Sequence, residues 1–422
     1  CALLLSTGVV MTIGAKWSVL IGAIFYVVFI AANLYPTWAT LIPSALALGA
    51  AAAVLWSAQG AYVTSAASAH AAALGLAPRA SMGLFNGTFF GIFQLSMLIG
   101  NIISSVILST GSSNKDHPEA SSDGSEDEDI SGSGSGGDSL TTQRFILFAV
   151  YSVICLVGVI GCIFMPSLTP SISSKTLNSS RDSLPQPSSS SSTGVPSLKT
   201  KLLGAVLLLK EPTMFLLIPF LIFSGLEQGF VFGNFTKEYI SINFGVKWVG
   251  FIMAVFGAVD SVFCVLFGRL GDKFGPRWNC YFGSLLFAIL LVTIGLWRES
   301  SFGHTLYAAF LWSILLGVAD AAVYGVFCTS VLSTLFTSRS EAAFSNLKVF
   351  QAGGTAVGFF LGSEITFTIK LIILGSIMTL GVACVIVLDK WVHSLGQVRN
   401  QSGTKSVESP EVPNEESTLL SH

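Results

Sequence analysis

Long apolar runs recur along almost the whole of this chain, and they restrict its fold more than any other feature. A helix that crosses a bilayer needs about 20 predominantly apolar residues. We interpret eleven segments as such spans, at 1–13, 17–35, 38–64, 83–109, 144–165, 213–234, 247–267, 280–297, 304–334, 343–362 and 366–388. Because backbone groups inside a bilayer must be hydrogen-bonded within the protein, each span should be a helix. The sequence therefore predicts an all-α protein that crosses the membrane many times.

The composition excludes several other classes of protein. Of the 422 residues, 52% are hydrophobic and only 10% are charged, whereas about 25% are charged in soluble proteins. The net charge of −2, without a basic patch, gives no indication of nucleic acid. All seven cysteines fall in the expected spans or at their edges, without metal-ligand spacing, so we expect no metal site and no structural disulfide. With no nucleophile elbow or phosphate loop, we expect neither an enzyme nor a cofactor.

A short basic turn with the sequence GRLGDKFGPR joins two of these spans at residues 268–277. Its glycines remove side chains at a place where two helices must turn and pack closely. Asp272 can cap the start of a helix, or it can pair with Arg269 or Arg277. Because Lys and Arg concentrate in cytosolic loops, we expect this turn to face the cytosol.

The same turn resembles the loop signature of the major facilitator superfamily, G-x-L-x-D-[RK]-x-G-x-[RK], and every defined position is filled. The resemblance implies twelve helices in two six-helix bundles, with this turn between the eighth and the ninth helix. It also implies that the acid and the basic residues form a latch, which holds the inner gate shut while the outer side is open. The expected latch residues are Gly268, Gly271, Asp272, Lys273, Gly275 and Arg277.

The two halves of the chain read as parallel repeats of about 200 residues. If the basic turn joins helices eight and nine, the corresponding joint in the first half is residues 12–16 (TIGAK), which keeps Gly14 but has no acid. Asn86 in the first half likewise corresponds to Asn346 in the second. Counting back from the turn, we expect eleven of the twelve helices, with the chain beginning at the second helix and the first one missing.

The polar segments divide the chain into domains. We expect an N-terminal bundle at 1–165 and a C-terminal bundle at 213–390, joined by a cytosolic Ser/Pro-rich linker at 166–212. Residues 110–142 are acidic and Gly/Ser-rich, so they should form a disordered outer loop, either a solvated spacer or a cation-attracting vestibule. A disordered cytosolic tail is expected at 391–422. With this topology most of the 21 Lys and Arg residues lie on the inner side.

Two short motifs lie outside the expected spans or at their edges. In the tail, Glu415, Leu419 and Leu420 fit an acidic dileucine sorting pattern, whose carboxylate and two apolar side chains would dock into a coat adaptor. Asn234 begins the triplet NFT, and it is the one Asn-x-Ser/Thr triplet at an expected outer loop. It is therefore the candidate glycosylation site.

Three acidic residues lie within expected spans of the second half: Glu227, Asp260 and Asp320. An ionised side chain at the bilayer centre costs about 2.5–3.5 kcal/mol on insertion scales. Because no Lys or Arg lies at a comparable depth, these acids should be protonated or share a cation. Our hypothesis is that they line a central cavity, together with Gln59, and handle a monovalent cation or a proton. The alternative is that each one makes a local hydrogen bond between helices.

Four segments narrow the resemblance further: LWSAQGAYVT at 55–64, SGLEQGF at 224–230, LGVADA at 316–321 and EAAFSN at 341–346. In this order they resemble the Unc-93 family, an atypical branch of the major facilitator fold, and most closely its A-type homologues. The resemblance implies a role that is often regulatory: some relatives are linked to potassium-channel complexes, and others escort Toll-like receptors to endosomes. After Asp320, VYGVFCTS replaces the Gln/Asn-rich stretch of those relatives, which argues against a shared polar solute site.

Three functions remain open from the sequence. The protein would regulate a potassium channel or ion balance, or it would be a secondary transporter that works by alternating access. The third possibility is a trafficking chaperone for membrane receptors, which the dileucine tail would serve. In each case we expect an integral protein of the plasma membrane or an endolysosomal membrane, with both ends of the full-length protein in the cytosol. The expected partners are the lipid bilayer, a potassium channel subunit or receptor, and coat adaptors.

Overall fold

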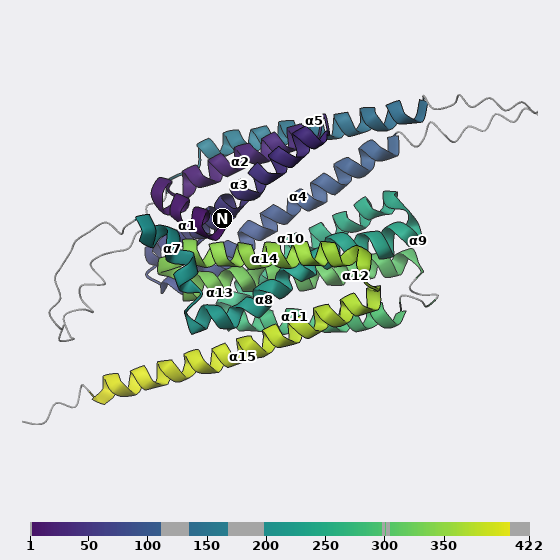
Figure 1. Ribbon diagram of the computed structural model, residues 1–422. Helices are drawn as coiled ribbons and strands as arrows, with labels where there is room; N and C mark the ends of the chain where they lie inside the picture. The colour runs from purple at the N-terminus through teal and green to yellow at the C-terminus, as the bar shows by residue number, and fades with distance from the viewer. Residues whose placement is uncertain (1, 111–134, 168–197, 298–299, 301–303, 406–422) are drawn as a thin grey trace, which may run out of the picture.

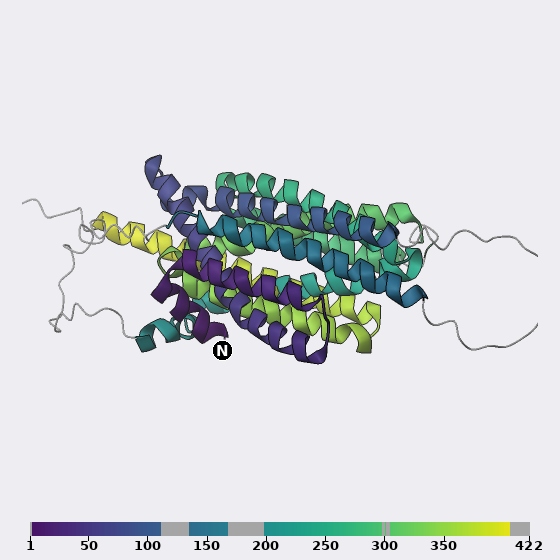
Figure 2. The same cartoon turned by 90° about the horizontal axis from the view of Figure 1, so that it is seen from above.

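The computed structural model describes residues 2–110, 135–167, 198–297, 300 and 304–405, and these parts are almost entirely helical. The sorting motif Glu415, Leu419 and Leu420 lies outside the described residues. Figure 1 and Figure 2 show long helices that run alongside one another in an elongated bundle.

Five long helices form the N-terminal half of the chain. They are α1 (Ala2–Ile13), α2 (Ala15–Ala32), α3 (Trp38–Ala73), α4 (Met82–Thr110) and α5 (Ser135–Ile163), with the 3-10 turn η1 (Pro78–Ser81) before α4. Thr37 and Thr40 form a capping box at the start of α3, which satisfies backbone N–H groups that lack a helical partner.

The C-terminal half has six continuous helical segments, which we call rods, and two of them contain a π-helical part. α8 (Pro212–Gly229) continues through the π-helical η3 (Phe230–Ser241) into α9 (Ile242–Phe244), and α12 (Leu306–Asp320) continues through the π-helical η4 (Ala321–Phe327) into α13 (Cys328–Leu335). The other rods are α10 (Val246–Phe274), α11 (Pro276–Trp297), α14 (Ser340–Glu364) and α15 (Phe367–Lys405), and the 3-10 turn η5 (Thr337–Arg339) precedes α14.

Every one of the eleven predicted spans is helical in the structure. Within the described residues, nine helices are long and apolar enough to cross a membrane, α1 and α14 not being among them. The polar segments differ in detail from the expectation. The last part of the expected loop 110–142 begins α5, the expected linker 166–212 ends in the helix α7 (Leu198–Leu208), and α15 continues to Lys405 although we expected disorder from residue 391.

The joints and the asparagines that the predicted repeat pairs are similar in local geometry. Gly14 and Gly275 occupy corresponding joints and share one left-handed conformation, with φ 85° and ψ 161° at Gly14 and φ 91° and ψ 150° at Gly275. Asn86 and Asn346 each donate a side-chain hydrogen bond to the carbonyl four residues earlier, at 2.8 and 3.1 Å. Only glycine adopts this joint conformation without strain.

The apolar core lies mainly in the C-terminal half. Among the membrane-span candidates, 33–67% of the most apolar window is buried in the C-terminal helices, against 0–22% in the N-terminal ones. The halves meet where α4 packs along α10 and where α14 packs on α1 and α3. We call the end at which α10 meets α11 the latch end; it lies on the left in Figure 1.

Candidate functional site

Three carboxyl groups are buried in the C-terminal half, and two of them lie at its interface with the N-terminal half. Glu227 comes from α8, Asp260 from α10 and Asp320 from the last position of α12, and they are 0%, 0% and 2% exposed. The amide nitrogen of Gln94, on α4 of the opposite half, donates to Oδ2 of Asp260 and lies 3.4 Å from Oδ2 of Asp320. One amide of the N-terminal half thus holds two carboxyl groups of the C-terminal half. We call these four residues the carboxyl cluster.

Glu227 differs from the two aspartates in its surroundings. Both of its carboxyl oxygens are buried without a hydrogen-bond partner among the described residues. A charge on Glu227 would be repelled by a charge on Asp320. Because an unpaired buried carboxylate costs several kcal/mol, the side chain is stable here only in its neutral form. Glu227 is therefore a buried carboxyl group whose two oxygens are open to a donor or a cation.

The chemistry of the cluster suits a proton or a monovalent cation. The thiol of Cys264 lies 3.2 Å from Oδ1 of Asp260, and Oδ2 of Asp260 and Oδ2 of Asp320 both face the amide nitrogen of Gln94. Two carboxyl groups this close do not both ionise readily, so they tend to share one proton. Among the residues described, no three His, Cys, Asp or Glu side chains are arranged to hold a metal ion.

An ammonium group lies in the same interface, and it was not among the predicted site residues. Lys348 of α14 places its Nζ 4.7 Å from the ring centre of Trp56 and 5.3 Å from that of Tyr324. It also donates to Oε1 of Gln351 at 2.9 Å. Trp56 belongs to the N-terminal half, so this cation–π contact joins the two halves as Gln94 does.

Asp272 contacts the N-terminal half at the latch end. Its two carboxylate oxygens accept hydrogen bonds from the backbone N–H groups of Gly83 and Leu84, each at 2.7 Å. The sequence left two roles open for Asp272, helix capping and pairing with an arginine. The structure shows helix capping, and the capped helix is α4 of the other half. A carboxylate at a helix N-terminus satisfies free N–H groups and interacts favourably with the helix dipole.

Glycines allow α4 and α10 to approach closely between the latch and the cluster. A side chain at Gly268 would collide with the carbonyl oxygen of Gly83 and lie 3.0 Å from the Cα of Gly87. Further along the same seam, the hydroxyl of Ser261 donates to the carbonyl of Gly91 at 2.5 Å. The seam therefore runs as one close helix–helix contact from Asp272 to the neighbourhood of Asp260.

The remaining latch residues have different surroundings. Gly271 faces the amide of Asn279, and Gly275 forms the left-handed joint. Lys273 lies 5.2 Å from the ring centre of Phe274. Arg277 pairs with Asp389 of α15 at 2.5 Å, within its own half. Asp272 is thus the latch residue whose charge contacts the other half.

Gln59 does not join the carboxyl cluster. It lines a different cavity, of about 490 Å³, between α2, α3 and α4, together with apolar side chains such as Phe85 and Phe89. Neither its amide oxygen nor its amide nitrogen has a hydrogen-bond partner among the described residues. The residue of the N-terminal half that belongs to the cluster is Gln94. In the sequence, Gln94 is marked only by being an amide within an otherwise apolar span.

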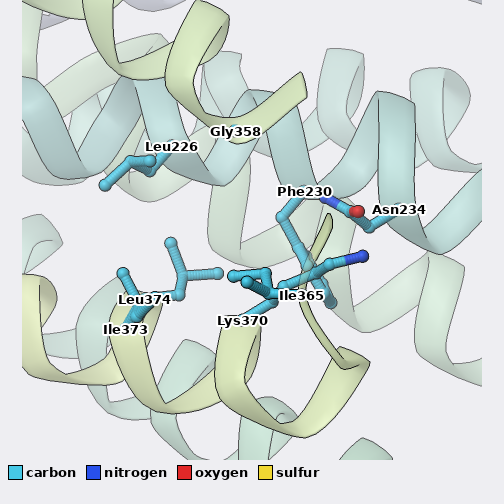
Figure 3. A pocket seen from close by; sticks show the side chains of 8 residues that line it. All are labelled: Leu226, Phe230, Asn234, Gly358, Ile365, Lys370, Ile373 and Leu374. Atoms are coloured by element: carbon cyan, nitrogen blue, oxygen red, sulfur yellow. The ribbon is translucent and has the colours of Figure 1, made fainter. Parts of the chain in front are cut away.

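Asn234 is poorly placed for a glycan. The residue is 5% exposed, lies within the π-helical η3, and lines a small cavity of about 30 Å³ with Phe230 and Lys370 (Figure 3). Its amide nitrogen lies 3.5 Å from the carbonyl oxygen of Gly229. Because a glycan acceptor lies at the surface, this burial argues against Asn234 as an acceptor, and its glycosylation stays a prediction.

Known proteins resemble the chain over most of its length. A family profile described as "Ion channel regulatory protein UNC-93" matches residues 1–386. Protein unc-93 homolog A of Xenopus laevis is 28% identical over 89% of this chain and 79% of that protein. The homolog A of Bos taurus is 30% identical over 88% of this chain and 79% of that protein. The unc-93 protein of Caenorhabditis elegans, whose name provisionally describes a potassium channel regulatory protein, is 25% identical over 90% of this chain and 53% of its own length.

Solved structures show the same fold. The proton:xylose symporter XylE, of the major facilitator superfamily, superposes with a TM-score of 0.62 at 13% identity, over 90% of this chain and 82% of XylE. FucP in its outward conformation superposes with a TM-score of 0.58 at 12% identity, over 92% of this chain and 86% of FucP. The architecture of the chain is therefore the major facilitator fold.

Proposed function

We propose a function from one established premise: this chain belongs to the Unc-93 family. The proposed role of the chain is to regulate potassium channel activity or ion balance. The carboxyl cluster is the part of the chain that responds to ions. The observation that carries this proposal is the contact of Gln94 with both Asp260 and Asp320. Gln94 belongs to one half and the two acids belong to the other, so a change of charge on the acids alters a contact between the halves.

The coupling follows from elementary electrostatics. The Gln94 amide can donate to a carboxylate, but adding a proton or a cation to the cluster changes which oxygens can accept from it. The α4–α10 seam connects this contact directly to Asp272, which caps the start of α4. A change of charge at Asp260 or Asp320 therefore shifts the balance between a latched and an unlatched arrangement of the two halves.

The names of the relatives support a potassium channel as the partner of this chain. The family profile carries the description of an ion channel regulatory protein, and the Caenorhabditis elegans relative carries a provisional potassium-channel role in its name. Under this proposal the latch end faces the cytosol, as the basic turn at 268–277 indicates. The arrangement of the two halves, rather than a solute passing between them, would then be what the channel recognises.

The test compares cells with purified protein. In cells that express the chain, rubidium efflux through endogenous potassium channels should change, and Asp260→Asn and Asp320→Asn should each abolish the change. Asp389→Asn is the matched control, because it neutralises an acid outside the cluster, and it should behave as the unchanged protein. An efflux that Asp260→Asn and Asp320→Asn leave unaltered would overturn the role of the cluster.

A second candidate is secondary transport of a cation by alternating access. It is favoured by Asp272, since a charge that caps a helix of the opposite half is a gate that can open and close. Vesicles that contain only the purified chain separate the two functions. Rubidium or proton flux that depends on Asp260 would establish transport, whereas no flux in vesicles together with altered efflux in cells supports regulation.

A third candidate, a trafficking chaperone, rests on the dileucine pattern at Glu415, Leu419 and Leu420. Retention of a receptor in the endoplasmic reticulum after deletion of the chain would support it. The same experiment, with the chain tagged, would show whether it resides in the plasma membrane or an endolysosomal membrane.

A further inference from the structure

A cavity of about 500 Å³ lies at the latch end, and none of the functions above uses it. It is bounded by both halves of the molecule. Arg79 of η1 and Met82 of α4 come from the N-terminal half, while the end of α10, the start of α11, α13 and the middle of α15 come from the C-terminal half. It is separate from the carboxyl cluster, none of whose residues line it.

The lining of this cavity is amphipathic. Apolar side chains form one wall; they are Phe327, Val331, Leu335, Val385, Leu388 and Val392. Two basic residues, Arg79 and Arg277, also line it. A ligand that fits must therefore carry an apolar chain and an anionic head.

Two observations show polar groups that a ligand would satisfy. No carboxylate among the described residues forms an ion pair with Arg79, which is exposed. Ser330 is 3% exposed and lines the cavity, yet its hydroxyl has no hydrogen-bond partner within the described chain. A buried hydroxyl without a partner is unfavourable, so a ligand oxygen placed there would be stabilising.

The two acids of the lining are already engaged. Asp272 accepts from the N–H groups that begin α4. Asp389 contacts Arg277 through the Nη1 of that residue, which leaves the Nη2 side of the guanidinium available. Since guanidinium groups bind phosphate oxygens through paired N–H donors, the two arginines can hold a phosphate between them.

We propose that this cavity binds an anionic phospholipid from the membrane leaflet at the latch end. The headgroup phosphate lies between Arg79 and Arg277, Ser330 donates to an ester or glycerol oxygen, and the first part of an acyl chain lies along α13 and α15. A lipid rather than a soluble phosphate is indicated by the apolar wall, which a free anion would leave uncovered. Because both halves line the cavity, a bound lipid favours the latched arrangement.

The test measures phosphatidylserine bound to the purified full chain in phosphatidylcholine nanodiscs. Arg79→Gln removes one cationic contact without breaking an ion pair, and it should weaken phosphatidylserine binding about fivefold. Arg79→Lys should retain most of the binding. Lys16→Gln is the matched control, since it removes one charge at the same end of the molecule without lining the cavity, and binding should be unchanged.

Two results would overturn the proposal. Equal losses in Arg79→Gln and Lys16→Gln would show general attraction to a charged surface instead of a site. Competition by glycerophosphoserine as strong as that by phosphatidylserine would show a site for a soluble phosphate ester. Retained binding in Lys16→Gln, with loss in Arg79→Gln and weak competition by glycerophosphoserine, supports the lipid site.

Discussion

At the scale of single residues, the same chemical group has different consequences in different surroundings. Asp272 and Asp389 are both carboxylates at the latch end, but Asp272 caps a helix of the opposite half while Asp389 pairs with an exposed arginine of its own half. Glu227 and Glu238 differ in a similar way, because only Glu238 has a basic partner, Lys370. These pairs allow a substitution and its control to be chemically identical.

Asp272→Asn should open the latch end. Each hydrogen bond to a charged acceptor contributes about 1.5–3 kcal/mol, and the amide loses the charge and one of the two acceptors. Spin labels at the exposed positions Leu76 and Phe274, which belong to opposite halves, should report a longer and broader distance distribution by electron–electron double resonance. Asp389→Asn removes a surface ion pair worth about 0–1 kcal/mol. The distribution of spin-label distances in this variant should match that of the unchanged protein. Identical distributions in all three proteins would contradict the assignment of Asp272 as the latch.

Glu227→Gln should leave the free energy of unfolding almost unchanged. Since the carboxyl group of Glu227 is neutral and unpartnered, a neutral amide of similar shape replaces it with a change below about 1 kcal/mol. Glu238→Gln breaks a pair with Lys370, whose side chain is 6% exposed, and should cost about 3–5 kcal/mol. Thermal unfolding in detergent at neutral pH checks both, and a large loss in Glu227→Gln would mean that its charge is paired.

At the scale of helices, small residues and π-helical turns decide how the elements meet. Asp320 immediately precedes the π-helical η4, and Glu227 lies within a turn of the π-helical η3. Such wider turns are frequent at functional sites. The α4–α10 seam needs glycine on both helices, because a Cβ atom at Gly268 would meet backbone rather than a flexible side chain.

Gly268→Ala should therefore destabilise the protein by about 1–3 kcal/mol through overpacking. Gly158→Ala is the matched control in α5, where an added Cβ would meet nothing within 4 Å. It should stabilise its helix by about 0.5–1 kcal/mol, since alanine restricts the unfolded chain more than glycine does. Opposite shifts of the thermal unfolding midpoint are expected, and a neutral Gly268→Ala would exclude close contact along the seam.

At the scale of the whole molecule, several of the polar contacts between the two halves could be exchanged during a rigid-body movement. Gln94 reaches across at the carboxyl cluster, Asp272 at the latch, and the hydroxyls of Ser6 and Ser345 lie 2.5 Å apart between α1 and α14. Proteins of this fold move largely by rocking one half against the other. A covalent bond across the interface should stop such a movement.

The double variant Ser6→Cys and Ser345→Cys should form a disulfide on mild oxidation, because its two side chains are already in contact. The cross-link should abolish the effect on rubidium efflux, and reduction should restore it. Ser345→Cys alone, treated with the same oxidant, controls for the native cysteines. An oxidised double variant with full activity would show that the halves need not move.

The sequence by itself determined the helices, their order and their correspondence between the halves. This was possible because a bilayer requires long apolar helices, and because the left-handed joint at Gly275 requires glycine. The motif at 268–277 also indicated that Asp272 could cap a helix. All of these properties are local in the chain or follow from its periodicity.

Only the tertiary structure decided which residues meet. Gln94 and Asp260 are separated by 166 positions, Asp272 and Gly83 by 189, and Arg277 and Asp389 by 112. Gln59 and Gln94 are both amides in apolar spans, and nothing in their sequence context shows that Gln94 reaches the acids while Gln59 faces a different cavity. Contacts of this kind depend on the rotation and crossing of packed helices, which hydrophobic patterning leaves largely undetermined.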